Sequence, residues 1–502
     1  MIPQLPKTIY FPTIMVPVIL LMEFSQIPPN IRIIIVVTIC EYHPFRYQNR
    51  IEFMTNLNPQ IPEAIFNFPD NFLWGTATSS YQNEGNNHNS NWSEWENISG
   101  KIINGEKSGL ACDWWSGKWK EDFNRAESTY QNAHRFSVEW SRIQPEENRW
   151  DEDAIEHYRQ MLRGLIERGM TPLITLHHFT EPYWFSEMGG WENSESFSYF
   201  GKYVHKVVEA LKDYCNIWIT INEPNVFVTM GFIEGIFPPG KTNLKSAFSV
   251  ITNLVKGHAK AYELIHQLQQ NAQVGTATNY RPFLPLKKWN PLDHAISKII
   301  DQNFNQSFNN AISNGKLNFA LKKQIISKAK KTQDFIGINY YTTDMIQFNL
   351  LRYKNLFSEM SWPLNSDLSE NKFIANVPSG MTSAIHWARK FNKPIYVTEN
   401  GIEDSNDLLR PSYMIEHLLN IWRTTNYIVP IKGYFYWTLV DNFEWERGWT
   451  QRFGLWGLDI STQLRIRRKS VDLYSEICRT NSISTSIIQN YAPRIVESVL
   501  PT

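Results

Sequence analysis

The sequence predicts a single α/β domain in which eight parallel strands close into a barrel, with the functional site at the carboxyl ends of the strands. Short runs rich in β-branched and aromatic residues alternate with longer amphipathic segments, which is typical of βα units and a parallel sheet. Eight such runs follow residue 70, and polar side chains stand at the end of nearly all of them. A (β/α)8 barrel of the TIM type brings all strand ends to one mouth, whereas a doubly wound open sheet gathers its polar groups at one switch point.

The strand-like runs can be placed in order along the chain. They are FLWGTATSSY from Phe72, AHRFSVEW from Ala133, TPLITLHHF from Thr171, NIWITINEP from Asn216, QVGTATNY from Gln273, DFIGINYYT from Asp334, PIYVTENG from Pro394 and KGYFYWTLVD from Lys432. Amphipathic patterns at residues 151–168, which open with an acidic first turn, and at residues 197–214 predict helices. A chain of 502 residues with 42% hydrophobic content can bury the large core that a barrel needs.

Ionisable and amide side chains come last in these runs. They are Gln82 and Glu84 after the first run, Arg135 and Glu139 in the second, His178 in the third, Asn222 and Glu223 in the fourth, Asn339 and Tyr341 in the sixth, Glu399 in the seventh and Glu444 after the eighth. Because the strand ends of a barrel face one mouth, we expect residues dispersed over the chain to meet there.

The two ends of the chain differ from the rest. Residues 1–53 contain two apolar stretches that are too short to cross a membrane as a helix, and no small-residue cleavage site follows Met22. We expect an N-terminal extension there, disordered or accessory, then a barrel domain over residues 54–482. The segment 483–502, which opens with Ser and Thr, is expected to be a peripheral tail.

Composition limits the partners. The 49 basic and 49 acidic side chains cancel, so neither nucleic acid nor a membrane surface is an expected partner and the substrate is expected to be uncharged. The chain holds 19 Trp, 22 Tyr and 29 Phe, and flat aromatic faces suit the apolar faces of sugar rings, although packing in a large core explains many of them.

The cysteines bear on compartment and metal content. The chain has four cysteines, which are scattered and form neither a CxxC pair nor a Cys/His cluster. This argues against a disulfide framework and a zinc site. This fits a reducing compartment, and we expect a cytoplasmic location. The sequence leaves the oligomeric state open.

Two peptides carry the chemistry. TINEP at residues 220–224 and VTENG at residues 397–401 each end an apolar run with a glutamate, and strands four and seven lie nearly opposite in an eight-membered ring. Cleavage of a glycosidic bond needs such a pair, because one carboxyl protonates the leaving oxygen while the other, ionised, supports the developing oxocarbenium centre. Desolvation beside Pro224 is expected to keep Glu223 protonated, and Arg135 and Tyr341 are expected to keep Glu399 ionised. A lone glutamate at a strand end is more often a cap or an ion-pair partner, but the matched pair favours catalysis.

Five motifs follow one another along the chain in the order FLWGTATSSYQNEG, HRFSVEWSRI, TINEP, VTENG and WTLVDNFEWERGWTQRFGLWGLD. Together they resemble glycoside hydrolase family 1, the β-glucosidase-like retaining enzymes, over roughly residues 66–477. The resemblance implies that Glu223 is the general acid/base and Glu399 the nucleophile, without a metal or cofactor. It also implies that Asn222 binds the sugar 2-hydroxyl, that Gln82, His178, Glu444 and Trp445 bind the other hydroxyls, that Trp437 stacks beneath the ring, and that Arg135, Asn339 and Tyr341 surround the nucleophile.

The resemblance also narrows the substrate. Members that act on 6-phosphorylated sugars typically replace the residue at Glu444 by a small one, and the thioglucosidase branch has lost the acid at Glu223, so this chain is expected to hydrolyse unphosphorylated O-glycosides such as β-D-glucosides or oligosaccharides. Glucose, galactose, fucose and mannose stay open as the preferred sugar. A non-catalytic glycan-binding relative would usually lack one glutamate, and a metal-dependent lyase would need His and Asp ligands at several strand ends.

The chain departs from the family pattern at two places. Phe179 stands where a tryptophan usually follows the strand-three histidine, and it is expected to keep the aromatic surface. MSWPLNSDLSENKFIANVPSGM at residues 360–381 replaces a GW and YPEGL-like loop, which leaves the preference for the leaving group open.

Overall fold

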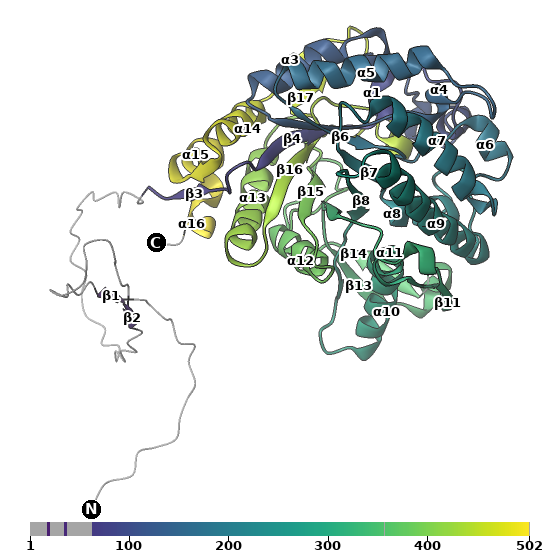
Figure 1. Cartoon of the computed structure of the whole chain (residues 1–502). Helices are drawn as coiled ribbons and strands as arrows, with labels where there is room; N and C mark the ends of the chain where they lie inside the picture. Colours follow the sequence, from purple (N-terminus) through teal and green to yellow (C-terminus); the bar gives the residue numbers. More distant parts are fainter. Residues whose placement is uncertain (1–17, 21–34, 38–62, 356, 501–502) are drawn as a thin grey trace, which may run out of the picture. The chain divides into compact units, whose positions relative to one another are not determined.

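The computed structural model describes residues 18–20, 35–37, 63–355 and 357–500 (Figure 1). The chain forms two units, residues 1–60 and 61–502. In the first unit, β1 (Val18–Leu20) pairs antiparallel with β2 (Ile35–Val37). The rest of the expected extension at residues 1–53, and the expected start of the domain at residue 54, lie outside the described residues.

Eight parallel strands form a closed barrel in the second unit. They are β4 (Leu73–Ala77), β5 (Ala133–Ser137), β6 (Thr171–Thr175), β7 (Ile217–Asn222), β8 (Gln273–Asn279), β12 (Phe335–Asn339), β15 (Ile395–Asn400) and β16 (Ile431–Trp437). They follow one another around the ring in sequence order, and β16 closes on β4 with Gly433 opposite Leu73 and Trp437 opposite Ala77. Each strand overlaps one of the eight predicted runs, so the predicted barrel is confirmed.

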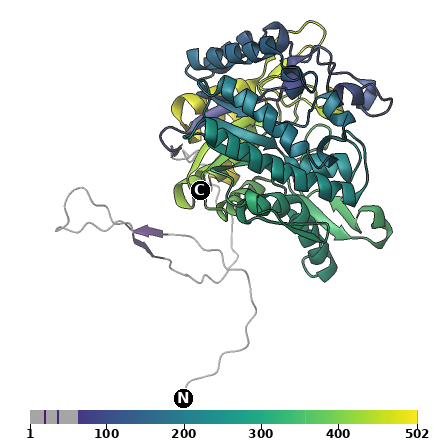
Figure 2. The ribbon, with the colours of Figure 1, turned by 45° about the vertical axis from the view of Figure 1, so that its right-hand side comes forward.

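Helices surround the barrel (Figures 1 and 2). They include α3 (Trp119–Ser128), α5 (Glu152–Glu167), α7 (Ser196–Leu211), α9 (Leu244–Leu268), α12 (Pro378–Arg389), α13 (Arg410–Tyr427) and α14 (Lys469–Thr480). The two helices predicted at residues 151–168 and 197–214 correspond to α5 and α7. The side chain of Asp151 caps α5 by accepting a hydrogen bond from the Ala154 N–H at 2.9 Å, which explains where this helix begins.

Further elements lie between the barrel strands or follow the last of them. They include α1 (Ser80–Glu84), α2 (Asn91–Trp95), α4 (Trp140–Ile143), α6 (Tyr183–Glu187), α8 (Pro224–Phe232), β9 (Phe283–Pro285), α10 (Pro291–Asp301), the π-helix η4 (Gln302–Gln306), α11 (Ser307–Asn314), β10 (Lys316–Phe319), β11 (Lys322–Ile325), β13 (Asp344–Phe348), β14 (Ser358–Ser361), η7 (Trp445–Arg447), β17 (Trp456–Leu458) and β18 (Arg465–Arg467). Within the described ranges, none of the helices combines the length and the apolar character that a membrane span requires.

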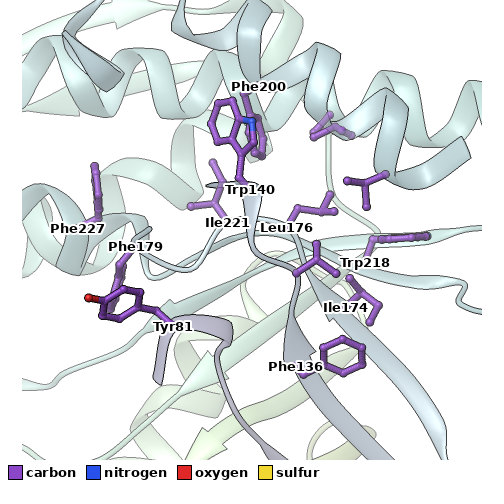
Figure 3. Close-up of a cluster of buried hydrophobic side chains, with 14 of the residues drawn as sticks. Tyr81, Phe136, Trp140, Ile174, Leu176, Phe179, Phe200, Trp218, Ile221 and Phe227 are labelled. Atoms are coloured by element: carbon purple, nitrogen blue, oxygen red, sulfur yellow. The ribbon is translucent and has the colours of Figure 1, made fainter. Parts of the chain in front are cut away.

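Outward-facing strand residues build the core between the barrel and its helices (Figure 3). Phe136, Ile174 and Trp218 occupy one row across β5, β6 and β7, and all three are buried. Because side chains alternate along a strand, their neighbour Arg135 points to the opposite, inner side of the barrel. Complete burial of a large apolar side chain stabilises a fold by about 1.5–3 kcal/mol. The burial of this row on the outer side therefore favours the strand orientation in which the alternate residues, such as Arg135, face the inside of the barrel.

The C-terminal segment differs from the peripheral tail expected at residues 483–502. Up to residue 500 it forms β19 (Ser482–Ser484), which pairs with β3 (Ile65–Asn67), then α15 (Thr485–Tyr491) and α16 (Val496–Val499). Ile483, Ile487 and Ile488 are buried in the core. The expectation was wrong because the opening Ser and Thr are helix-start residues: the Ser484 hydroxyl accepts a hydrogen bond from the Ile487 N–H at 3.2 Å.

Candidate active site

Glu399 lies near the end of β15, where both of its carboxylate oxygens accept hydrogen bonds. Arg135 Nη1 donates to Oε1 at 2.5 Å and the Tyr341 hydroxyl donates to Oε2 at 2.6 Å. Burial raises the pKa of Glu399, while the Arg135 charge and the Tyr341 hydrogen bond act in the opposite direction. The structure therefore brings Arg135 and Tyr341, two of the three residues that the sequence predicts around this carboxylate, into contact with it, while the third, Asn339, donates to Glu223.

Glu223 lies between the end of β7 and the start of α8. Its backbone is left-handed, with φ of 44°, and Pro224 opens the helix that follows. Asn339 Nδ2 and Asn279 Nδ2 each donate to Glu223 Oε1 at 2.9 Å. Burial, and after it the negative charge of Glu399, raises the pKa of Glu223 to about 8.

The two glutamates therefore differ in their surroundings. A guanidinium contacts Glu399, whereas neutral amides contact Glu223. A cation in contact stabilises an ionised carboxylate more than an amide does. We therefore expect Glu399 to be the first of the two to lose its proton.

Arg135 connects the nucleophile side to the sugar-binding side. Its Nη2 donates to Asn222 Oδ1 at 2.6 Å, and Asn222 Nδ2 lies 3.0 Å from His178 Nε2. Burial and the Arg135 charge lower the pKa of His178, so the imidazole is neutral and its Nε2 accepts from Asn222. The Nδ1 atom of His178 then carries the proton, and it has no hydrogen-bond partner among the described residues. It is available to a ligand hydroxyl.

One cavity of about 650 Å³ joins these groups. Glu223, Glu399, His178, Tyr341, Trp437, Glu444 and Trp445 all line it. Gln82 is linked to the cavity by Glu444. Its Nε2 atom donates to Glu444 Oε2 at 3.1 Å and to the Phe443 carbonyl at 2.8 Å. Burial, with the nearby charges of Glu446 and Glu399, raises the pKa of Glu444 to about 8, so this side chain can both donate and accept hydrogen bonds at neutral pH.

Aromatic rings form one side of the cavity. Trp445 packs against Tyr81 with nearly parallel rings, and the Phe179 ring meets it edge-on at 5.1 Å. Phe179 itself lines the cavity, so the aromatic surface expected at this position is present. Trp437, at the end of β16, lies beside Gly401, where a Cβ atom would stand 2.0 Å from the Trp437 carbonyl oxygen. Only glycine fits there.

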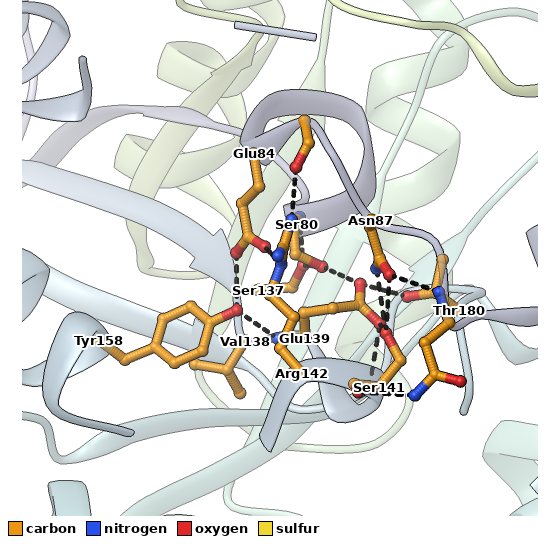
Figure 4. A network of polar contacts seen from close by, with 12 residues as sticks. Ser80, Glu84, Asn87, Ser137, Val138, Glu139, Ser141, Arg142, Tyr158 and Thr180 are labelled. Atoms are coloured by element: carbon orange, nitrogen blue, oxygen red, sulfur yellow. Dashed lines mark hydrogen bonds and ion pairs between the residues drawn. The ribbon is translucent and has the colours of Figure 1, made fainter. Parts of the chain in front are cut away.

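Glu84 and Glu139, two of the polar residues at the strand ends, support α1 and α4 in a buried network (Figure 4). Glu84 accepts from Arg142 Nε and from the Tyr158 hydroxyl, both at 2.7 Å. Glu139 accepts from the hydroxyls of Ser80, Ser141 and Thr180 at 2.7–2.8 Å. These two carboxyl groups therefore hold in place the helix that carries Gln82.

Asn279 is a site residue that the sequence reasoning missed. It ends β8 and contacts Glu223, as Asn339 does from the end of β12. The strand-end rule that selected Asn339 applies equally to Asn279 in the run QVGTATNY, so that signal was available. Among the described residues, no three His, Cys, Asp or Glu side chains are grouped so that they could hold a metal ion.

Comparison with known proteins agrees with this geometry. A β-glucosidase A of Thermotoga maritima is 32% identical over 449 residues, which are 83% of this chain and 98% of that protein. A β-galactosidase of Pyrococcus woesei is 29% identical and covers 84% of this chain and 98% of its own length.

Solved structures give the same result. The β-glycosidase from Pyrococcus horikoshii superposes with a TM-score of 0.80 and 37% identity, over 85% of this chain and 98% of that one. The family 1 β-glucosidase from Thermotoga maritima superposes with a TM-score of 0.79 and 30% identity, over 84% and 100%. The family model described as glycosyl hydrolase family 1 matches residues 65–483. The resemblance found in the sequence is therefore confirmed, and the chain belongs to glycosyl hydrolase family 1.

Proposed function

We propose that this chain hydrolyses terminal β-glycosidic bonds of uncharged O-glycosides with retention of configuration, and that β-D-glucosides are its preferred substrates. The observation that carries the proposal is the pair of carboxyl groups in one cavity with unlike partners. Glu399 has a guanidinium and a phenol, while Glu223 has two amides and a pKa raised to about 8. An ionised nucleophile and a protonated acid are what a retaining glycosidase needs.

In the first step, a Glu399 oxygen forms a bond to the anomeric carbon while the bond to the leaving oxygen breaks. Glu223 gives its proton to that oxygen, and the sugar stays attached to Glu399 as an ester. In the second step, Glu223 takes a proton from water, whose oxygen attacks the anomeric carbon and displaces Glu399. Two inversions give net retention, and both carboxyl groups return to their initial protonation states.

The remaining site residues are proposed to hold the sugar. Asn222, positioned by Arg135, binds the 2-hydroxyl, while Gln82, His178, Glu444 and Trp445 bind the other hydroxyls and Trp437 stacks on the ring. The Thermotoga maritima relative has been solved with castanospermine and with glucoimidazole, which are small sugar-like ligands. One relative is named a β-glucosidase and another a β-galactosidase, so a preference for β-galactosides is the alternative. Fucosides and mannosides are further alternatives within the same family.

A panel of 4-nitrophenyl β-glycosides tests this proposal. The β-glucoside is expected to have the highest kcat/KM, and Glu399→Gly is expected to lower it by about 10³-fold or more because no covalent intermediate can form. Folded Glu399→Gly protein, verified by circular dichroism, that keeps full activity would refute the role of Glu399. A higher kcat/KM for the galactoside would overturn the glucose preference alone.

The location is part of the proposal. Cys112, Cys215 and Cys478 are buried free thiols. Free thiols fit a reducing compartment, and we place the protein in the cytoplasm on that ground.

A further inference from the structure

The cavity that contains Glu223 and Glu399 continues past the acid into a region with a different lining. We call this region the outer chamber and define it by Val226, Met230, Ile233, Ile300 and Phe304, all of which line the same cavity as the two glutamates. The leaving group of the substrate must lie on the side of Glu223, since this residue protonates the leaving oxygen.

Helix α8 forms one wall of the outer chamber. It begins directly after Glu223, and Val226, Thr229, Met230 and Ile233 are spaced three or four residues apart, so they share one face. These four are half-exposed, while Phe227, Val228 and Phe232 on the other face are buried. The seven steps from Val226 to Ile233, the residue that caps α8, correspond to about 10 Å of helix, so a largely apolar wall leads away from the acid.

A second part of the lining comes from the end of α10 and from η4. Ile300, Asn303 and Phe304 have helical spacing and line the cavity together. The segment Gln302–Gln306 is π-helical, and single π-turns within longer helices occur frequently at functional sites. Met360 on β14 adds a further apolar side chain from the loop that departs from the family pattern, and it is 54% exposed.

Two polar side chains that line the cavity near the outer chamber, Asn303 and Thr342, already have partners. Asn303 Oδ1 accepts from the Ala320 N–H and its Nδ2 donates to the Ile299 carbonyl, both at 2.7 Å. Thr342 Oγ1 donates to the Ala375 carbonyl at 3.0 Å and accepts from the Ala375 N–H at 3.1 Å.

The charged side chains that line the same cavity include Glu234 and Arg352, and two others among them have partners. Asp344 is ion-paired with Arg281, and Glu359 accepts from Asn349 at 2.8 Å. A second sugar would bring several hydroxyls that need new partners, whereas an apolar group needs none.

We propose that the outer chamber binds an apolar aglycone, an alkyl chain or an aryl group, in preference to a second sugar. This inference rests on the proposed glycosidase function and specifies the leaving-group class for the same site. The physical basis is transfer of apolar surface from water to a wall of Val, Met, Ile and Phe side chains beside the acid.

A series of n-alkyl β-glucosides from methyl to octyl, with cellobiose alongside, tests the proposal. We expect kcat/KM to rise about threefold for each of the first several methylenes, which is most of the transfer free energy of a buried CH₂. Cellobiose is expected to fall below hexyl β-glucoside. A flat series, or cellobiose as the best substrate, overturns the apolar aglycone and leaves the glycosidase function standing. Absence of hydrolysis for every glucoside, including the 4-nitrophenyl one, refutes the proposed function itself.

Two adjacent isoleucines give a matched pair of variants. Ile300 lines the outer chamber, while Ile299 on the same helix is 45% exposed and is not part of the cavity lining. Ile300→Ser is expected to lower the ratio of hexyl to methyl kcat/KM several-fold, and Ile299→Ser to keep the wild-type ratio. Met230→Ser, on the other wall, is expected to lower the ratio as Ile300→Ser does and serves if that variant fails to fold. An unchanged ratio in the folded chamber variants contradicts the proposal.

Discussion

At the residue scale, Glu223 and Glu399 share one cavity but have different hydrogen-bond partners. Arg135 is fully buried and gives donors to Glu399, Asn222, Thr175 and the Thr398 carbonyl. A guanidinium can serve several acceptors at once because its donors form a fixed planar fork. One cation therefore orients the carboxylate that is proposed as the nucleophile and the amide that is proposed to bind the sugar.

The amides on Glu223 tune its proton affinity. Glu223 has a pKa raised to about 8 and must be protonated to act as the acid, so kcat/KM is expected to fall as pH rises through this value. Asn279 stabilises the ionised form, so Asn279→Ala is expected to raise the pKa and to move the alkaline limb upward by on the order of half a pH unit. The pH dependence of kcat/KM for a 4-nitrophenyl β-glucoside, compared between the variant and the wild type, measures this shift. A limb that stays in place or moves to lower pH contradicts the assigned contact.

Removal of the acid separates substrates by leaving group. Glu223→Ala is expected to reduce kcat/KM for alkyl β-glucosides by at least about 10²-fold more than for 2,4-dinitrophenyl β-glucoside, because a dinitrophenolate departs without protonation. Single-turnover rates on both substrates check this, and the wild-type ratio is the control. Equal losses on the two substrates would be incompatible with Glu223 as proton donor.

At the scale of the element, α1 has five residues and two functions. Gln82 contacts Glu444 at the cavity, while Ser80 and Glu84 bind the network of Glu139, Arg142 and Tyr158. A helix this short is marginal by itself, so its position depends on these contacts. The contacts of Ser80 and Glu84 therefore hold Gln82 in its position at the cavity.

The pKa of Glu84 makes that support dependent on pH. Burial raises it from 4.5 to about 7, so between these values the folded protein holds a proton that the unfolded chain has released. The free energy of unfolding falls across this window as pH rises, by at most about 3 kcal/mol. Glutamine does not titrate, so the Glu84→Gln variant does not lose this free energy of unfolding. The variant is expected to match the wild type near pH 4.5 and to exceed its stability above pH 7, as measured by denaturant unfolding at both pH values.

An exposed glutamate on α2 supplies the control. Glu94→Gln is expected to leave the pH dependence of unfolding unchanged, because Glu94 is exposed. A Glu84→Gln variant with the wild-type pH dependence would mean that Glu84 is ionised in the folded protein throughout.

The sequence predicts elements with a strong period better than those set by distant contacts. The eight strands carry apolar runs with polar ends, so both their existence and the convergence of Arg135, Glu223 and Glu399 follow from local pattern. The π-turn at Gln302–Gln306 has no such pattern. The outer chamber is likewise invisible in sequence, because its walls at α8 and η4 are separated by more than 60 residues and meet only in the fold.

At the scale of the whole molecule, the C-terminal segment up to residue 500 packs against the start of the barrel domain. β19 pairs with β3 near the start of the domain, and α15 places Ile487 and Ile488 in the core. A composition rule that treats Ser and Thr as tail residues fails here, because the apolar residues that follow them at helical spacing decide the fold. The last segment of the chain is therefore structural.

Truncation of one of those side chains tests this role. Ile488→Ala is expected to lower the free energy of unfolding by about 2–5 kcal/mol, since a buried isoleucine leaves a cavity in a close-packed core. Gln489→Ala, on the exposed side of the same helix, is the control and is expected to change stability by less than about 0.5 kcal/mol. Denaturant unfolding of both variants measures the difference, and equal stabilities would show that the segment contributes little.

The missing methyl group at Gly401 has a consequence for engineering. A Cβ atom at that position would collide with the backbone carbonyl of Trp437, so the spacing between the segment that follows Glu399 and the strand that carries Trp437 is set by backbone packing. Libraries that seek a new sugar preference will therefore find this spacing inflexible. Positions whose side chains line the cavity, such as Met230 and Ile300, are better targets.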